Sequence, residues 1–208
     1  MYPVITLGRE YGSGGRAIGE KTAELLGIHY FNKELLALAA KESGIDYHVA
    51  GSVDEKPNGS FLYSIVTGMR PRSDGAYDNN ILTLNDRLYI AQKNVIERLS
   101  ESPCLIVGRC ADYILRDHPN HVSIFIYAPF EYRVHRVAME YGMTLEDAKE
   151  RVTKTDKNRA IYYKNNTEWK WGDIKNYSMA FDSSKMSIDG IASVIAEYVK
   201  NYDKKDAE

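Results

Sequence analysis

The sequence has little cysteine, no long apolar run and no basic leader. Its 208 residues contain 2 cysteines, Cys104 and Cys110, and neither belongs to a spacing that binds zinc. Such sparse cysteine predicts reduced thiols in a cytosolic protein. No apolar stretch approaches the roughly 20 residues of a membrane span. The N-terminus "MYPVITLG" lacks the basic flank and cleavable apolar region of a signal peptide. We therefore expect a cytoplasmic protein with no membrane partner.

An excess of charge of one sign is also missing. The chain carries 27 basic and 29 acidic residues, a formal charge of -2, so no global field attracts it to nucleic acid. Apolar residues make up 44% and charged residues 27%, as in an ordinary globular protein. The length predicts a single domain over residues 1–208, and the balanced charge predicts no nucleic-acid partner; the oligomeric state stays open.

Short apolar runs alternate with helical patterns along the chain. The apolar runs predict strands at 3–8, 28–32, 103–108, 121–128 and 177–184. Between and after them, the 3.6-residue periodicity predicts helices at 16–26, 33–44, 83–102, 129–141, 144–165 and 187–202, and a short helix follows the run 103–108 and ends at about 116. This alternation indicates an α/β fold with a parallel sheet and helices on both faces.

The periodicity weakens between residues 45 and 86. Glycine, proline and asparagine punctuate this stretch, so we expect an inserted segment rather than part of the sheet.

The stretch "ITLGREYGSGGRAIG" carries the clearest sign of chemistry. Gly12, Gly14 and Gly15 lie between a predicted strand and a predicted helix. A helix N-terminus presents unpaired N–H groups and partial positive charge, and glycines let the backbone approach a phosphate. The lysine and hydroxyl that usually close such a loop are absent, and a glycine-rich turn without a ligand is the alternative.

Several segments together resemble the cytidylate kinase-like family, a branch of the nucleoside monophosphate kinases. They are "ITLGREYGSGGRAIGEKTAELLGIHYFNKELL", "LIVGRCADYIL", "FIYAPFEYRVHRV", "TDKNRAIYYK" and "WGDIKNYSMAFDSSKMSIDG", in this order along nearly the whole chain. The resemblance implies a P-loop fold with a five-stranded parallel sheet. It also implies a monophosphate-binding insertion, here 45–86, and a lid, here about 142–172. The implied ligands are ATP, Mg²⁺ and an acceptor nucleotide.

On the ATP side, the resemblance places Gly15 at the usual lysine and Ala17 at the usual magnesium hydroxyl. Arg16 is the candidate substitute for that lysine, and a solvent-facing helix arginine is its alternative. Ser13 is the one hydroxyl in the loop and the candidate magnesium ligand. The predicted ATP-binding residues are Arg9, Gly12, Ser13, Gly14, Gly15, Arg16 and Ala17.

On the acceptor side, "GRCAD" takes the place of the Gly-Arg-Asp segment that serves the acceptor in cytidylate kinases. Cys110 stands at the aspartate, so Asp112 is a possible replacement or, equally, a helix cap. The predicted acceptor-binding residues are Lys33, Arg109, Asp112, Asp156 and Arg159.

Catalysis of phosphoryl transfer needs positive groups around the transferring phosphoryl group and little acid–base work. Arg133 and Arg136 lie three apart and share a helix face, and we favour Arg133. The predicted catalytic residues are Arg16, Arg133 and Arg159, with solvated surface charges as the alternative.

Three hypotheses follow from these residues. The first is a kinase for a nucleoside monophosphate, with CMP or dCMP as the first acceptor to test. The second is a nucleotide-sensing module without transfer, since the lysine, the magnesium hydroxyl and the Gly-Arg-Asp segment are missing. The third is a kinase for a different small acceptor, which the altered segment 32–38 leaves open.

Overall fold

The protein is built around a sheet of five parallel strands. The computed structural model describes residues 2–54 and 83–202. The strands are β1 (Val4–Arg9), β2 (His29–Phe31), β3 (Cys104–Val107), β4 (His121–Tyr127) and β5 (Met179–Asp182), in the spatial order β2-β3-β1-β4-β5. Four of them lie within the runs that the sequence predicted, and β1 extends one residue beyond its predicted run of 3–8. The expected α/β fold with an all-parallel sheet is therefore confirmed.

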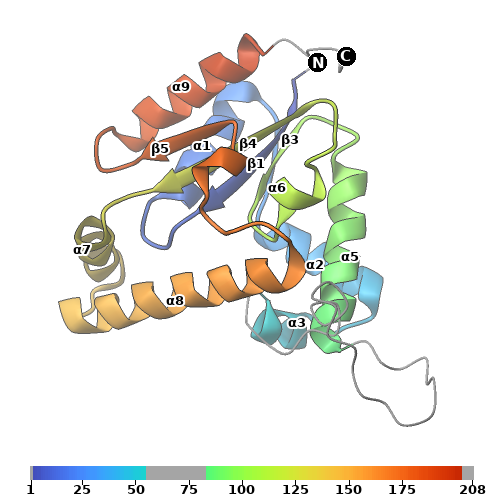
Figure 1. Cartoon of the computed structure of the whole chain (residues 1–208), viewed down its shortest axis with the longest axis horizontal. Helices are drawn as coiled ribbons and strands as arrows, with labels where there is room; N and C mark the ends of the chain where they lie inside the picture. The colour runs from blue at the N-terminus through green and yellow to red at the C-terminus, as the bar shows by residue number, and fades with distance from the viewer. Residues whose placement is uncertain (1, 55–82, 203–208) are drawn as a thin grey trace.

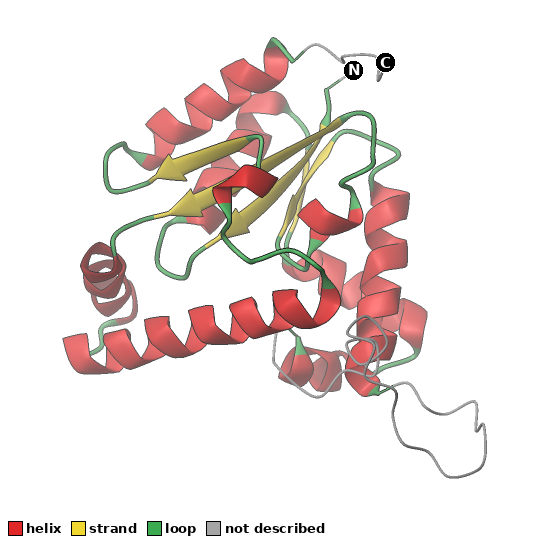
Figure 2. Cartoon of the chain, in the orientation of Figure 1, coloured by secondary structure: helices red, strands yellow, loops and turns green. Residues whose placement is uncertain are grey.

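Helices cover both faces of this sheet (Figures 1 and 2). Along β1, side chains alternate: Ile5 and Leu7 pack with α1 (Gly15–Leu26) and α9 (Ile188–Lys200) on one face. Val4 packs on the other face with α2 (Lys33–Ser43) and α5 (Leu84–Leu99). Continuous apolar runs such as "VITL" suit a strand that is buried on both sides.

Local signals account for where several helices begin and end. Gly27 ends α1 with a left-handed φ of +64°, and its N–H reaches the carbonyls of Ala23 and Glu24. A reciprocal capping box of Thr83 and Asp86 begins α5. Two short elements have no counterpart among the predicted ones: α3 (Tyr47–Val53) and the 3₁₀ turn η1 (Ile174–Asn176).

The helices α7 (Phe130–Tyr141) and α8 (Leu145–Asn166) form a hairpin outside the two main layers. They share a small apolar core of Val134, Val137, Ala148 and Val152. Figure 1 shows α8 running across the end of the molecule to which the strands point. A short helix, α6 (Ala111–Ile114), follows β3.

The predicted insertion 45–86 is described only at its two ends, in α3 and at the start of α5; residues 55–82 lie outside the described residues. The predicted lid, about 142–172, corresponds mostly to α8, and its closing motion stays a prediction.

Among the described residues, no helix is both long enough and apolar enough to cross a bilayer.

Candidate active site

A cleft of about 640 Å³ opens at the carboxyl ends of the strands. Its walls come from the loop after β1, the loop after β3, the start of α2 and parts of α7 and α8. Since β1 and β3 are neighbours in the sheet, their loops meet here. Open α/β sheets bind ligands at this edge, and the volume lies within the roughly 300–1,000 Å³ of small-molecule sites.

The loop after β1 requires its glycines. Gly12 and Gly14 have φ of +81° and +80°, a region that L side chains rarely adopt. A Cβ on Gly12 would lie 2.8 Å from the carbonyl oxygen of Arg133, and one on Gly15 would lie 2.7 Å from Cβ of Arg9. At Gly12 and Gly15, the loop backbone therefore lies too close to neighbouring atoms for any side chain to fit.

This loop delivers the first turn of α1 to the cleft. The first helical hydrogen bond runs from the amide of Ile18 to the carbonyl of Gly14 at 3.0 Å, so the amides of Gly15, Arg16 and Ala17 precede the hydrogen-bonded part of the helix. The first turn has no acidic residue and no side-chain cap, and these residues line the cleft. Exposed amides at an uncapped N-terminus form a site for an anion such as phosphate.

Two arginines of α7 lie against this loop in different ways. Arg133 is buried; its Nε donates to the Ala128 carbonyl at 3.0 Å and pairs with Glu10 at 3.1 Å. Its Nη1 contacts the Tyr11 carbonyl at 3.0 Å and pairs with Asp156. Burial raises the pKa of Glu10, and the amide of Ala128 and the charge of Arg133 oppose that shift.

Arg136 lies above the loop and lines the cleft. A Cβ on Gly14 would lie 2.9 Å from Nη1 of Arg136, so the guanidinium sits directly over the residue that caps α1. Unlike Arg133, it makes no hydrogen bond or ion pair with another described residue. Arg136 is the cation of α7 that lies over the start of α1.

The loop after β3 has an unusual backbone. Gly108, Arg109 and Cys110 have φ of +73°, +54° and +56° in succession. Left-handed residues other than glycine are strained and cluster at functional sites. The guanidinium of Arg109 is buried, donates to the Val107 carbonyl at 3.1 Å and pairs with Asp54 at 2.9 Å.

The Arg109–Asp54 pair continues into a polar network. Gln92 Nε2 donates to Asp54 at 3.0 Å, and its Oε1 accepts from the Tyr162 hydroxyl at 2.9 Å. This network joins the end of α3, α5 and α8 beside the cleft.

Asp112 lies in a small adjoining cavity of about 20 Å³. Burial raises the pKa of Asp112, while hydrogen bonds from Tyr163, at 2.7 Å, and Tyr177 oppose that shift. The cavity has room for about one water molecule. Asp112 therefore does not face the open cleft.

Comparison with known proteins decides the family. The family model described as "Cytidylate kinase-like family" matches residues 4–185. This chain belongs to the cytidylate kinase-like family. The match covers both the loop after β1 and the loop after β3.

Relatives agree with this assignment, and solved structures agree with the fold. Proteins named cytidylate kinase from Methanopyrus kandleri and Pyrococcus furiosus are each 24% identical over 201 residues, covering 92% and 96% of this chain and 90% of each relative. A crystal structure of an uncharacterized protein from Eubacterium ventriosum is 28% identical, with a TM-score of 0.70 over 96% of this chain and 99% of that one. Shikimate kinase from Acinetobacter baumannii, 13% identical with a TM-score of 0.51 over 97% and 94% of the two chains, shares the fold.

For a member of this family, the loop fits the phosphates of a nucleotide, because the uncapped first turn of α1 lines the cleft and carries no acidic residue. The carboxylate of this loop, Glu10, lines the cleft but pairs with Arg133 and accepts from the amide of Ala128. Ser13 is fully buried; its hydroxyl donates to the Glu10 carbonyl at 2.8 Å, and its carbonyl accepts from Ser183 at 2.6 Å. This argues against the prediction that Ser13 binds magnesium. Within residues 2–54 and 83–202, no group of three or more His, Cys, Asp or Glu side chains could hold a metal.

The predicted site residues divide into two groups. The cleft is lined by Arg9, Gly12, Gly14, Gly15, Arg16, Ala17, Lys33, Arg109 and Arg159. Ser13, Asp112, Arg133 and Asp156 lie outside that lining. For Arg133, the predicted catalytic contact conflicts with its position, because two carboxylates and two carbonyls already surround its guanidinium.

Asp156 also departs from its predicted role in binding the acceptor. Its Oδ1 accepts from the amide of Tyr11 at 2.8 Å, and its Oδ2 pairs with Arg133. Arg136, not among the predicted catalytic residues, reaches the position expected of Arg133. The spacing of Arg133 and Arg136 indicated a shared face but could not tell which side chain turns inward.

Proposed function

We propose that this protein transfers the γ-phosphoryl group of ATP to a nucleoside monophosphate, with CMP or dCMP as the acceptor to test first. The observation that carries the proposal is the uncapped N-terminus of α1 beneath Arg136, in a cleft that Arg109 and Lys33 also line. A donor phosphate group and an acceptor would both find cationic partners within that cleft. The names of the curated relatives support CMP as the first choice.

The chemistry would be positioning and electrostatics. In the transfer, an oxygen of the acceptor phosphate forms a bond to the γ-phosphorus of ATP. The bond between the γ-phosphorus and the β,γ-bridging oxygen breaks, so the products are ADP and the nucleoside diphosphate of the acceptor. The amides of Gly15 to Ala17 and the guanidinium of Arg136 would stabilise negative charge on the transferring group. Magnesium, carried by the nucleotide, would supply further positive charge there.

The test is an isotope-transfer assay with γ-labelled ATP, magnesium and a panel of acceptors. The panel holds CMP, dCMP, UMP, AMP, GMP, shikimate and gluconate, the last two because proteins named shikimate kinase and gluconokinase share the fold. We expect labelled CDP or dCDP. Label on shikimate or gluconate alone would assign a different acceptor, and ADP binding without any transfer would favour the sensing module.

Two glycine variants control for the site. Gly12→Ala adds a Cβ 2.8 Å from a carbonyl oxygen at a φ of +81° and should abolish transfer. Gly27→Ala imposes the same left-handed strain, about 1–2 kcal/mol, at a φ of +64° with nothing within 4 Å. It should retain transfer, because its cost falls on stability alone.

A further inference from the structure

Tyr11 is held to the α7–α8 hairpin by its amide, its carbonyl and its ring. Its amide donates to Asp156 Oδ1 at 2.8 Å, and its carbonyl accepts from Arg133 Nη1 at 3.0 Å. The guanidinium carbons of Arg151 and Arg159 each lie 5.6 Å from the centre of its ring. Tyr11 therefore connects the phosphate-binding loop to α7 and α8, which lie more than a hundred residues later in the sequence.

The residues on either side are held in the same way. Arg159 Nη1 donates to the carbonyl of Arg9 at 3.2 Å, and Glu10 pairs with Arg133. Gly12 packs against the backbone of α7 at Arg133. The loop from residue 9 to residue 12 thus takes its shape from contacts with α7 and α8.

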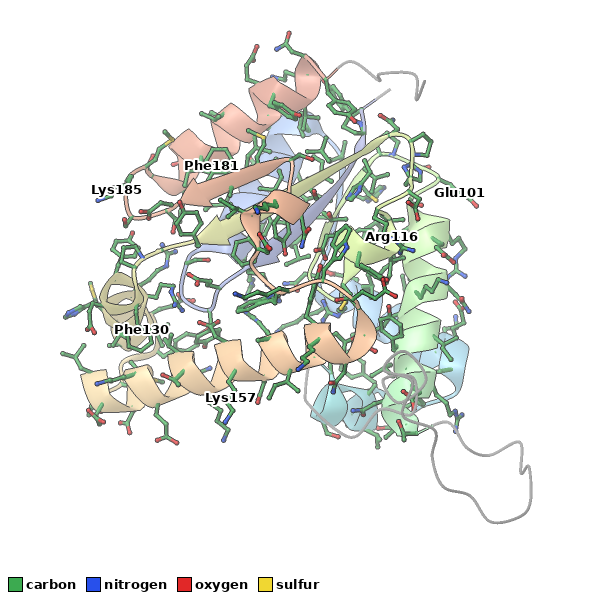
Figure 3. All side chains as sticks on the ribbon, in the orientation of Figure 1. Glu101, Arg116, Phe130, Lys157, Phe181 and Lys185 are labelled. Carbon is green, nitrogen blue, oxygen red and sulfur yellow. The ribbon has the colours of Figure 1, made fainter. Side chains whose placement is uncertain are left out.

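Asp156 is central to this arrangement. One carboxylate oxygen accepts from the loop amide and the other pairs with Arg133, which itself holds the loop carbonyl. The side chains of Asp156 and Arg133 are only 17% and 7% exposed. Its neighbour Lys157 points away from the sheet on the outer side of α8 (Figure 3). Charge-assisted hydrogen bonds shielded from water are the strong ones, so removing this carboxylate should release the loop.

We propose that Asp156 is a positioning residue that fixes the loop so that the first-turn amides of α1 face a bound polyphosphate. Asp156 acts through Tyr11 and Arg133 and does not touch the ligand. Because the loop lacks a lysine, its affinity for phosphate depends on the placement of its amides. The inference rests on the proposed function only for the identity of that ligand, a nucleotide.

The first test measures ADP binding by calorimetry, in magnesium and without an acceptor. Asp156→Ala removes both contacts, and Asp156→Asn keeps an oxygen for the Tyr11 amide but removes the charge facing Arg133. We expect roughly tenfold to hundredfold weaker ADP binding for Asp156→Ala and a smaller loss for Asp156→Asn. The matched control is Glu150→Ala, which removes an acidic side chain from the exposed face of the same helix and should stay within about twofold of wild type.

A second readout needs no ligand. Hydrogen–deuterium exchange of the free protein should show faster exchange for the amides of residues 11–16 in Asp156→Ala than in wild type or Glu150→Ala. A purely structural role would lower the unfolding temperature without changing ADP affinity in the folded variant.

The outcomes separate this inference from the proposed function. ADP affinity within about twofold of wild type for folded Asp156→Ala overturns the inference, as does a defect confined to the KM for the acceptor. If wild type binds ADP but transfers nothing, the proposed function fails and the ADP series still decides the role of Asp156. If wild type binds no ADP, unchanged exchange of the loop amides in Asp156→Ala overturns the inference and faster exchange supports it.

Discussion

At the scale of single residues, the site depends on which arginine remains available to a ligand. Arg133 is surrounded by Glu10, Asp156 and two carbonyls, so its charge is already compensated. Arg136, one turn further along α7, lies over Gly14 and lines the cleft. The cation above the first turn of α1 thus comes from another helix instead of from the loop itself.

This arrangement predicts unequal effects for two substitutions. Arg136→Ala should lower kcat/KM for ATP by about 100-fold, since it removes the cation over the loop. Arg16→Ala should lower it by less than about tenfold, because Arg16 is exposed at the rim of the cleft. Steady-state kinetics with the acceptor found in the panel assay measure both values.

Arg136→Lys serves as the control for charge, and it should recover part of the loss. A larger defect in Arg16→Ala than in Arg136→Ala would instead identify Arg16 as the substitute for the missing lysine.

The sequence could locate the residues of this site but not their orientation. Glycine spacing and the strand before it placed the loop, because both are local signals. The inward turn of Arg133 depends on Glu10 and Asp156, which lie 123 positions before and 23 positions after it in the chain. The hydroxyl of Ser13 donates to the Glu10 carbonyl three residues before it, while Ser183, 170 residues away in the chain, donates to the carbonyl of Ser13.

At the scale of elements, β1 and β4 are joined by a polar contact inside an apolar sheet. Nε2 of His121, the first residue of β4, lies 2.7 Å from the hydroxyl of Thr6 in β1. Burial lowers the pKa of His121 to about 4, and the nearby His118 adds to the shift. The folded protein therefore holds this histidine neutral at pH values where an unfolded chain protonates it.

This difference predicts an acid-dependent loss of stability. Above about pH 6.5, the ordinary pKa of histidine, both states are neutral and the full stability is present. As the pH falls towards about 4, the unfolded state gains a proton and the free energy of unfolding drops by up to about 3 kcal/mol. Denaturant unfolding from pH 7 to pH 4 measures this slope.

The control is His121→Gln, for which the free energy of unfolding should fall less between pH 7 and pH 4 than it does in wild type. The raised pKa values of Glu10 and Asp112 favour the folded state at low pH, so only the difference between wild type and variant isolates His121. Parallel profiles for the two proteins would contradict the assignment.

The helix α8 shows a second limit of the sequence at this scale. Its charged pattern predicted the helix, and the structure confirms it, with the Thr144 hydroxyl accepting from the amide of Asp147 at 3.1 Å. Solvated surface charges were the alternative interpretation of its basic residues. Instead, α8 holds the loop through Asp156 and Arg159, and it contacts Gln92 and Asp112 through Tyr162 and Tyr163.

At the scale of the whole molecule, the fold was predictable because each strand and most helices carry their own local pattern. The five apolar runs gave the number of strands, and the resemblance to the family implied the same number. The contacts that shape the loop were not predictable, since they join residues from β1, α7, α8 and the segment after β5. These contacts make the site a property of the assembled chain.

A ligand on the loop should therefore stabilise the entire protein and not one local part. At an ADP concentration about 100 times the Kd, binding adds about 2.7 kcal/mol to the free energy of unfolding. For a chain of this size, that corresponds to a rise in Tm of roughly 5–10 °C in a single transition. Scanning calorimetry with and without ADP measures the shift.

Gly27→Ala should start from a lower Tm and show the same shift, whereas Gly12→Ala should show none. A first transition that ADP leaves in place would mean that the loop and the α7–α8 hairpin unfold separately from the sheet.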